Sequence, residues 1–140
     1  MERSLLLVKP DAMERGLSGA IIERIEAMGL KLVALKMLHM DDALARRHYA
    51  PHAAKPFFPG LVSYITSAPI VAAVFEGEDA VSRIRHCMGA TDPARAERGT
   101  LRADFGIDIE RNAVHGSDSP ATAKEEIKLF FSDKEIFGAD

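Results

Sequence analysis

One short stretch of the chain combines residue types that can perform nucleophilic chemistry. Residues 112–119 read NAVHGSDS, which places His115 among small residues with a glycine directly after it. Asp118, Glu125 and Glu126 lie close enough along the chain for a carboxylate to orient the imidazole. A histidine held in this way acts as a nucleophile or as a general base near neutral pH.

Four cationic residues are candidates for binding phosphate. Lys9 ends an apolar run, Lys55 lies among prolines, Arg85 falls on a predicted helix, and Arg102 follows a Gly-Thr pair. A lone Lys or Arg is most often a solvated surface charge, so none of them alone indicates a site. The chain has no G-x-x-x-x-G-K-[ST] motif and no G-x-G-x-x-G motif after a strand. If it binds nucleotides, we therefore expect side chains rather than a backbone cradle to hold the phosphates.

The spacing of histidine and cysteine predicts no metal site held by protein ligands. The other histidines, at 39, 48, 52 and 86, form no H-x-x-x-H or H-E-x-x-H pair on one predicted helix. Cys87 is the only cysteine, which excludes an internal disulfide and favours a reducing, cytoplasmic location.

Length and composition are those of one ordinary globular domain, which we expect to span residues 1–140. Apolar residues make up 47% and charged residues 28% of the chain. No apolar run approaches the ~18 residues of a membrane span, and the N-terminus lacks the apolar core of a signal peptide. The net charge of −3 argues against a broad nucleic-acid surface, so any phosphate site is expected to be a local pocket.

Hydrophobic periodicity predicts the elements that position these residues. Residues 31–40 are apolar on both faces, which predicts an inner strand, and Asp41 and Asp79 are expected to cap helices. The remaining expected elements are strands at 4–8, 69–75 and 112–115 and helices at 17–28, 41–50, 79–88 and 121–131. Residues 89–105 show only turn signals and basic side chains.

The order β-α-β-(α)-β-α-β-α favours an α+β fold of the ferredoxin-like type. In that split β-α-β sandwich, a four-stranded antiparallel sheet carries its helices on one face. An open, fully parallel sheet is the alternative.

The motifs, taken together, resemble those of the nucleoside diphosphate kinase family. The NAVHGSDS stretch is similar to that family's active-site signature, and Lys9-Pro10-Asp11 resembles its opening motif. Further similar segments are Y-A-P-H-A-A-K-P-F-F at 49–58, R-x-x-x-G-x-T-x-P at 85–93, G-T-x-R-x-D-F at 99–105, and the tail F-F-S-D-K-E-I-F. The resemblance covers essentially the whole chain. Ala12 and Ala68 stand where the family usually has glycine.

The resemblance implies a ping-pong transfer of the γ-phosphoryl group from a nucleoside triphosphate to a nucleoside diphosphate through a phosphohistidine. His115 occupies the nucleophile position, and Glu126 matches the glutamate that orients it. The remaining roles follow the same matches: Lys9, Tyr49, Arg85, Thr91 and Arg102 around the phosphates, His52 as a further phosphate contact, Asn112 at the ribose, and Phe57 and Ile109 on the two faces of the base.

The resemblance also implies a cofactor and an assembly. Mg²⁺ would arrive with the nucleotide, held by its phosphates more than by the protein. Members of the family are homo-oligomers, so we expect a hexamer or a tetramer. No membrane or specific nucleic-acid partner is expected.

Two other functions are compatible with the same residues. A ferredoxin-like domain that only binds a nucleotide would use His115 as a pocket wall, and Glu126 would have no role. A histidine-dependent phosphohydrolase would release phosphate without needing an acceptor diphosphate.

Overall fold

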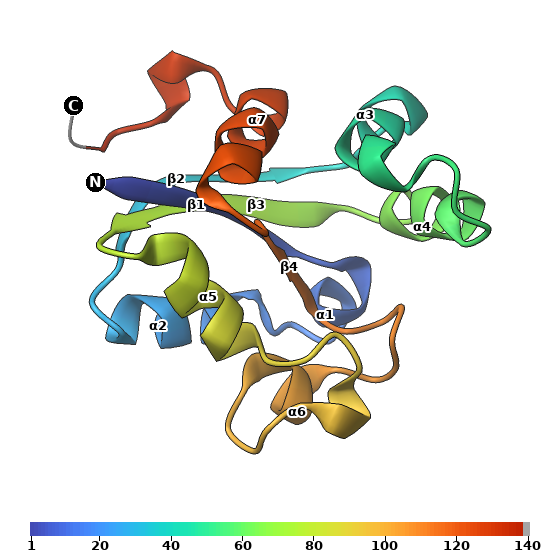
Figure 1. Ribbon diagram of the computed structural model, residues 1–140, viewed down its shortest axis with the longest axis horizontal. Helices are drawn as coiled ribbons and strands as arrows, with labels where there is room; N and C mark the ends of the chain where they lie inside the picture. Colours follow the sequence, from blue (N-terminus) through green and yellow to red (C-terminus); the bar gives the residue numbers. More distant parts are fainter. Residues whose placement is uncertain (139–140) are drawn as a thin grey trace.

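The computed structural model describes residues 1–138, which form a four-stranded antiparallel sheet with helices around it (Figure 1). The strands are β1 (Glu2–Val8), β2 (Lys31–Leu38), β3 (Ile70–Gly77) and β4 (Val114–Gly116). They are arranged in the order β2-β3-β1-β4, and each neighbouring pair is antiparallel. The expected α+β, ferredoxin-like fold is therefore confirmed, and the alternative of a parallel sheet is wrong.

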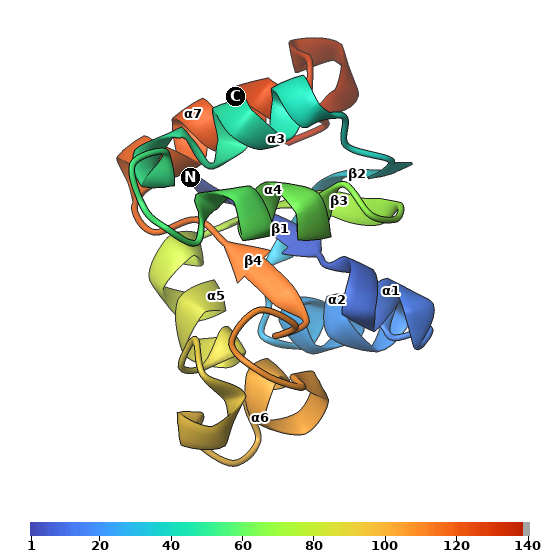
Figure 2. The same ribbon diagram turned by 90° about the vertical axis from the view of Figure 1, so that its right-hand side faces the viewer.

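Two helices make the split β-α-β connections. Helix α2 (Ser18–Ala27) lies between β1 and β2 in sequence, and α5 (Ala80–Met88) lies between β3 and β4. Each connection crosses over one strand, since β3 separates β1 from β2 and β1 separates β3 from β4. Both helices pack on the same face of the sheet, as expected for this fold (Figure 2).

The opposite face of the sheet is also covered, which corrects the expectation that helices lie on one face only. Leu5 and Leu7 of β1 pack with residues of α3 and α7, whereas Leu6 and Val8 pack with residues of α2 and α5. Figures 1 and 2 show α3 and α7 on the far side of the sheet from α2 and α5. The physical reason is that β1 is apolar on both faces, so each face needs a covering layer.

The helices not yet given are α1 (Pro10–Glu14), α3 (Asp42–His48), α4 (Phe58–Ile65), α6 (Leu101–Phe105) and α7 (Pro120–Phe130). Helices α1, α4 and α6 were not predicted, because five to eight residues are too few to display a clear helical period. Three turns of 3₁₀ helix occupy Ala50–His52, Pro93–Arg95 and Asp133–Glu135. Within residues 1–138, no helix has the length and apolarity needed to cross a bilayer.

One of the two expected helix caps forms and the other does not, and a third cap forms at Ser119. Asp41 accepts a hydrogen bond from Leu44 N at 2.8 Å, and the Ser119 hydroxyl accepts one from Thr122 N at 3.1 Å. Asp79 precedes α5 with φ +52° and makes no capping bond through its side chain. The carboxylate of Glu2 accepts the bond from Val81 N instead, at 2.8 Å, which no local pattern predicts.

Strand β2 lies at an edge of the sheet, which corrects its prediction as an inner strand. Its apolar outer residues Leu35 and Met37 are 50% and 64% exposed. Apolar residues on both faces therefore do not identify an inner strand here. Ala12 and Ala68 cause no strain, because positive φ among non-glycine residues 1–138 occurs only at Asp79 and Ala113.

Candidate active site

The structure brings the site residues that the resemblance assigns to one cleft of about 820 Å³, whereas Lys55, the fourth candidate cation, is exposed and does not line it. The cleft lies where α3, α4, α5 and α7 meet the strand β4 and the segment before it. The predicted residues along it are Lys9, Tyr49, His52, Phe57, Arg85, Thr91, Arg102, Ile109, Asn112, His115 and Glu126. Residues more than 100 positions apart in the sequence thus share one site.

His115 is held by a carboxylate through only one of its two ring nitrogens. Its Nε2 lies 2.9 Å from Oε2 of Glu126, and the side chain is 24% exposed. A carboxylate only accepts hydrogen bonds, so Nε2 carries the proton in this contact. In the neutral ring the lone pair is then on Nδ1, which is the nitrogen available for attack.

Glu126 is fixed in turn by a serine that the sequence reasoning missed. Ser117 donates through Oγ to Oε1 of Glu126 at 2.7 Å and accepts from Leu5 N at 3.2 Å. Burial alone would raise the pKa of Glu126, but hydrogen bonds from His115 and Ser117 outweigh it and leave the pKa below its usual value. The carboxylate is therefore ionised at neutral pH. Ser117 stands two residues after His115, so residue spacing along a strand was the available signal.

Lys9 is a buried cation directed at the same cleft from the end of β1. Its Nζ donates to the carbonyl of Glu110 at 2.7 Å and to Oδ1 of Asn112 at 2.8 Å. Asn112 donates through Nδ2 to the carbonyl of Thr91 at 3.0 Å. Burial, more than the nearby Arg102, lowers the pKa of Lys9 to about 8. Lys9 therefore retains its charge at neutral pH and loses it in mild alkali.

The two arginines differ in how firmly they are held. Arg102, on α6, is buried and donates to the carbonyls of Gly89 and Val114 at 3.1 and 2.9 Å. Burial, assisted by Arg85, lowers the pKa of Arg102 to about 10. Arg85 makes an exposed ion pair with Asp118 at 2.7 Å. Exposed pairs contribute little, so Arg85 can exchange this partner for an incoming anion.

Aromatic and apolar side chains line the outer part of the cleft. Phe57 is 52% exposed while Phe58 is buried, so the two adjacent rings do point apart. The rings of His52 and Phe57 lie 5.7 Å apart, and Ile109 is also exposed. Tyr49 is buried, and its burial raises the pKa of the hydroxyl well above its usual value.

A strained turn precedes β4 and is tied to α1. Ala113 has φ +74°, and a bond of 2.9 Å from Val114 N to the carbonyl of Asn112 closes the turn around it. Asp11 accepts from Ala113 N at 3.0 Å, and Lys9 N donates to the carbonyl of Ala113 at 2.9 Å. The turn thus fixes Asn112 and His115 on either side of a single strained residue.

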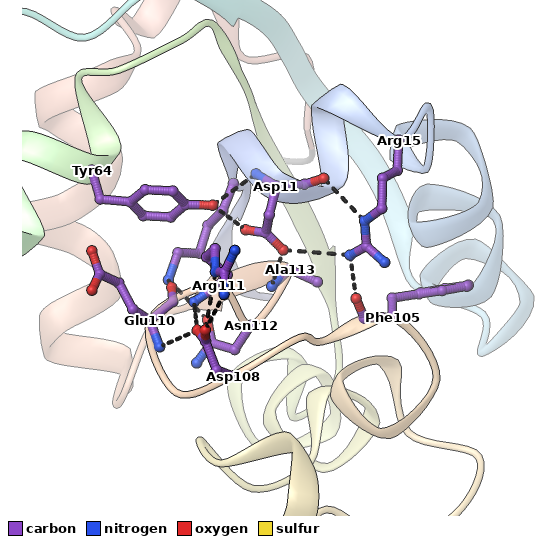
Figure 3. A network of polar contacts seen from close by, with 10 residues as sticks. Asp11, Arg15, Tyr64, Phe105, Asp108, Glu110, Arg111, Asn112 and Ala113 are labelled. Atoms are coloured by element: carbon purple, nitrogen blue, oxygen red, sulfur yellow. Dashed lines mark hydrogen bonds and ion pairs between the residues drawn. The ribbon is translucent and has the colours of Figure 1, made fainter.

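Figure 3 shows how Asp11 is itself anchored. The Tyr64 hydroxyl donates to Oδ1 of Asp11 at 2.6 Å and accepts from Asp11 N at 2.8 Å. Arg15 lies against the same carboxylate and also donates to the carbonyl of Phe105. Tyr64 and Arg15 gave no sequence signal, because their partners lie far away in the chain or on an unpredicted helix.

His48 is a further residue that the sequence reasoning missed. Its side chain is fully buried, and its ring centroid lies 4.6 Å from that of His115 at an interplanar angle of 78°. Burial, with a contribution from His115, lowers the pKa of His48 to about 3, so the ring is neutral. Neither ring nitrogen has a hydrogen-bond partner among the described residues.

A ferredoxin-like sheet with an oriented imidazole, an ionised carboxylate behind it and three cations around it is suited to phosphoryl transfer. These features define the chain as a phosphotransferase.

The comparisons with known proteins give the particular family. The family model described as "Nucleoside diphosphate kinase" matches residues 2–136. A nucleoside diphosphate kinase of Dehalococcoides mccartyi is 64% identical over 140 residues, which cover 100% of this chain and 99% of that protein. One from Archaeoglobus fulgidus is 56% identical over 136 residues, covering 97% of this chain and 90% of the relative.

Solved structures agree with the relatives. The Aquifex aeolicus nucleoside diphosphate kinase superimposes with a TM-score of 0.94 at 45% identity, covering 96% of this chain and 98% of that one. A halophilic nucleoside diphosphate kinase from Halobacterium salinarum, in complex with CDP, superimposes with a TM-score of 0.95 at 48% identity. The match covers 99% of this chain and 93% of that one. The chain belongs to the nucleoside diphosphate kinase family, and its function is that family's transfer of phosphoryl groups between nucleotides.

Proposed function

We propose that this chain transfers the γ-phosphoryl group of a nucleoside triphosphate to a nucleoside diphosphate through a phosphohistidine at His115. The observation that carries this proposal is the bond from Nε2 of His115 to Glu126, because it leaves the lone pair on Nδ1. In the first step Nδ1 forms a bond to phosphorus, the bond to the bridging oxygen breaks, and the diphosphate leaves with the electron pair. A second diphosphate then takes the phosphoryl group by the reverse step.

Glu126 has two roles in this reaction. It holds the proton on Nε2, and it stabilises the positive charge that develops on the ring as Nδ1 attacks. Ser117 supports the proposal, since its hydrogen bond keeps the carboxylate in place.

The cations of the cleft are proposed to bind the phosphates. Lys9, Arg85 and Arg102 supply positive charge, and Tyr49, His52 and Thr91 supply further polar contacts. Asn112 is proposed to bind the ribose, while Phe57 and Ile109 take the two faces of the base.

Mg²⁺ is proposed to enter with the nucleotide and to neutralise charge on the transferring phosphates. The cleft fits this role, because among residues 1–138 the carboxylates along it, those of Glu110, Asp118, Glu125 and Glu126, form no group of three that could hold the ion by themselves. Within residues 1–138, the one cluster able to hold an ion contains two imidazoles, whereas Mg²⁺ prefers oxygen ligands.

We also propose a cytoplasmic, single-domain protein that assembles into a homo-oligomer, either a hexamer or a tetramer. The exposed edge of β2 supports assembly, since apolar Leu35 and Met37 are uncovered there.

The test is incubation of the protein with γ-labelled ATP and Mg²⁺, with and without an added diphosphate. We expect acid-labile label on the wild type, which an acceptor diphosphate removes as labelled triphosphate. His115→Ala should lose transfer by at least about 10⁴-fold, whereas His86→Ala, an exposed control outside the cleft, should not. Steady release of free phosphate would indicate a phosphohydrolase, and no label at all would indicate a binding module.

Glu126→Gln provides a second arm of the same assay. We expect kcat to fall by about 10–10³-fold, because the neutral amide no longer stabilises the charged ring. Glu78→Gln is the matched control, because Glu78 is exposed and does not line the cleft. Equal rates for the Glu126→Gln variant and the wild type would remove Glu126 from the proposed mechanism.

A further inference from the structure

Three side chains with metal-ligating atoms meet in the cleft. His48 comes from α3, His115 from β4 and Glu126 from α7, and one donor atom of each lies within 4.8 Å of the other two. Oε2 of Glu126 lies 2.9 Å from Nε2 of His115 and 3.6 Å from Nδ1 of His48.

These separations are near those of a tetrahedral metal site. Ligand atoms about 2.1 Å from a Zn²⁺ ion are about 3.4 Å from one another in tetrahedral geometry. The two measured distances to Oε2 bracket that value. The two imidazole nitrogens lie within 4.8 Å of each other, so the rings of His48 and His115 would close on the ion to complete the set.

His48 is the independent sign of a ligand. Its side chain is completely buried, yet neither nitrogen has a hydrogen-bond partner within residues 1–138. Buried polar groups are normally paired, so an imidazole with an uncommitted lone pair requires an explanation. Edge contacts with the rings of Tyr49 and Phe130, at 4.6 and 5.5 Å, hold the ring beside the other two ligands.

We propose that His48, His115 and Glu126 form a binding site for a divalent transition metal of the Zn²⁺ type, and that the bound metal inhibits phosphoryl transfer. Two imidazoles and one carboxylate are a ligand set that Zn²⁺ accepts, with the fourth position open to water or a phosphate oxygen. Mg²⁺ requires oxygen ligands and is excluded by the same set. The site is thus distinct from the magnesium that enters with the nucleotide.

Inhibition follows from proton positions. A metal on Nε2 of His115 displaces the proton from that nitrogen, and the neutral ring then carries its proton on Nδ1. Nδ1 has no lone pair for attack in that form, and Glu126 is no longer available to the ring. The inhibitory effect rests on the proposed role of His115, whereas metal binding does not.

Binding is tested by titrating untagged, nucleotide-free protein with Zn²⁺ in a calorimeter. We expect one ion per chain, and a thermal stabilisation that Mg²⁺ does not produce. His48→Gln should lower the affinity at least about tenfold, and His86→Gln, an exposed histidine outside the cleft, should leave it unchanged. Glu126→Gln keeps the shape of the side chain and should also lower the Zn²⁺ affinity. It serves as a second test if the His48→Gln variant fails to fold. Undiminished Zn²⁺ affinity in either folded variant would overturn the site.

Inhibition is tested by labelling with γ-labelled ATP at buffered free Zn²⁺. We expect Zn²⁺ to reduce the label taken up by the wild type and by His86→Gln. For His48→Gln, the ratio of label with Zn²⁺ to label without Zn²⁺ should stay near one. If Zn²⁺ binds through all three residues but the Zn²⁺-free protein takes up no label in the presence of Mg²⁺, the proposed function is refuted and the metal site still stands. Normal labelling that Zn²⁺ does not affect would refute the inhibition.

Discussion

At the scale of single residues, burial and hydrogen bonding determine what each titratable group can do. Glu126 and Lys9 are both buried residues. Bonds from His115 and Ser117 keep Glu126 ionised, whereas burial brings Lys9 close to losing its proton. At neutral pH the site therefore contains an ionised carboxylate, Glu126, and a cation, Lys9, whose charge is lost as the pH rises.

Lys9 predicts a loss of activity in mild alkali. Its pKa of about 8 means that the free enzyme loses this charge as pH rises through that value. We expect kcat/KM for a nucleoside triphosphate to fall above about pH 8, and kcat to hold to higher pH because bound phosphates favour the charged form. Lys9→Gln should lack this limb of the pH profile, and Lys55→Gln should retain it. The same limb in Lys9→Gln would contradict the assignment.

The same proton affects stability with a definite sign. Between about pH 8 and 10.5 the folded state releases the proton of Lys9, while the unfolded chain keeps it. The unfolded state then binds more protons, so the contribution of Lys9 to the free energy of unfolding rises with pH in that window. Urea unfolding of the wild type and of Lys9→Gln across this range measures the difference.

Phe57 predicts weak discrimination among bases. A ring face is common to all bases, whereas discrimination requires hydrogen bonds to base edges. We expect kcat/KM for ATP, GTP and CTP to agree within about 10²-fold. Phe57→Ala should weaken all three by about 1–3 kcal/mol, and Phe137→Ala, exposed outside the cleft, should have no effect. A loss of kcat/KM for only one of the three nucleotides would show that the protein recognises the edge of that base.

At the scale of elements, the connection between α1 and β4 positions the nucleophile. Ala113 holds an unfavourable φ because Asp11 and Lys9 bind its backbone from the start of α1 and the end of β1. Strain of this kind, on the order of 1–3 kcal/mol, persists only where the surroundings enforce it.

Asp11→Asn is expected to lower the free energy of unfolding by about 1–3 kcal/mol. An amide cannot accept from both Tyr64 and Ala113 through two oxygens, so the turn loses an anchor. Asp42→Asn is the control: it breaks an exposed ion pair with Arg46 and should change the free energy of unfolding by less than about 0.5 kcal/mol. Ala113→Gly in the Asp11→Asn background should recover part of the loss, because glycine adopts positive φ without strain. Equal unfolding curves for wild type and Asp11→Asn would refute the anchoring role.

At the scale of the whole molecule, the sheet is covered on both faces but open along β2. Phe137 N donates to the carbonyl of Val33, and beyond that point the apolar Leu35 and Met37 are uncovered. An open edge with exposed apolar side chains favours pairing with another chain.

Light scattering at micromolar concentration is expected to give a mass that is a multiple of 15.3 kDa. The double variant Leu35→Lys, Met37→Lys should have a smaller mass in solution than the wild type, because charges on an edge strand oppose pairing. Lys128→Glu, on the exposed side of α7, is the control and should leave the mass unchanged. A wild-type mass near 15.3 kDa would contradict the proposed assembly.

Patterns along the chain predicted the order of the main elements and most of the residues that line the cleft. Apolar runs and turn residues located the strands that form the sheet, and the local motifs named His115, Glu126 and Lys9. Periodicity reports only which residues share a face of one element. It therefore left open the short helices α1, α4 and α6, and it placed β2 inside the sheet instead of at its edge.

The residues that support the site could be identified only from the folded chain. His48, Ser117 and Tyr64 act through contacts with residues elsewhere in the fold. Ser117 bonds Glu126, which is near in sequence, but it also bonds Leu5 at the other end of the chain. The covering of both sheet faces, the cap of α5 by Glu2 and the unpaired imidazole beside His115 likewise depend on long-range packing. Burial and hydrogen bonding also set the pKa values of Lys9 and Glu126, because desolvation exists only once the chain has folded around them.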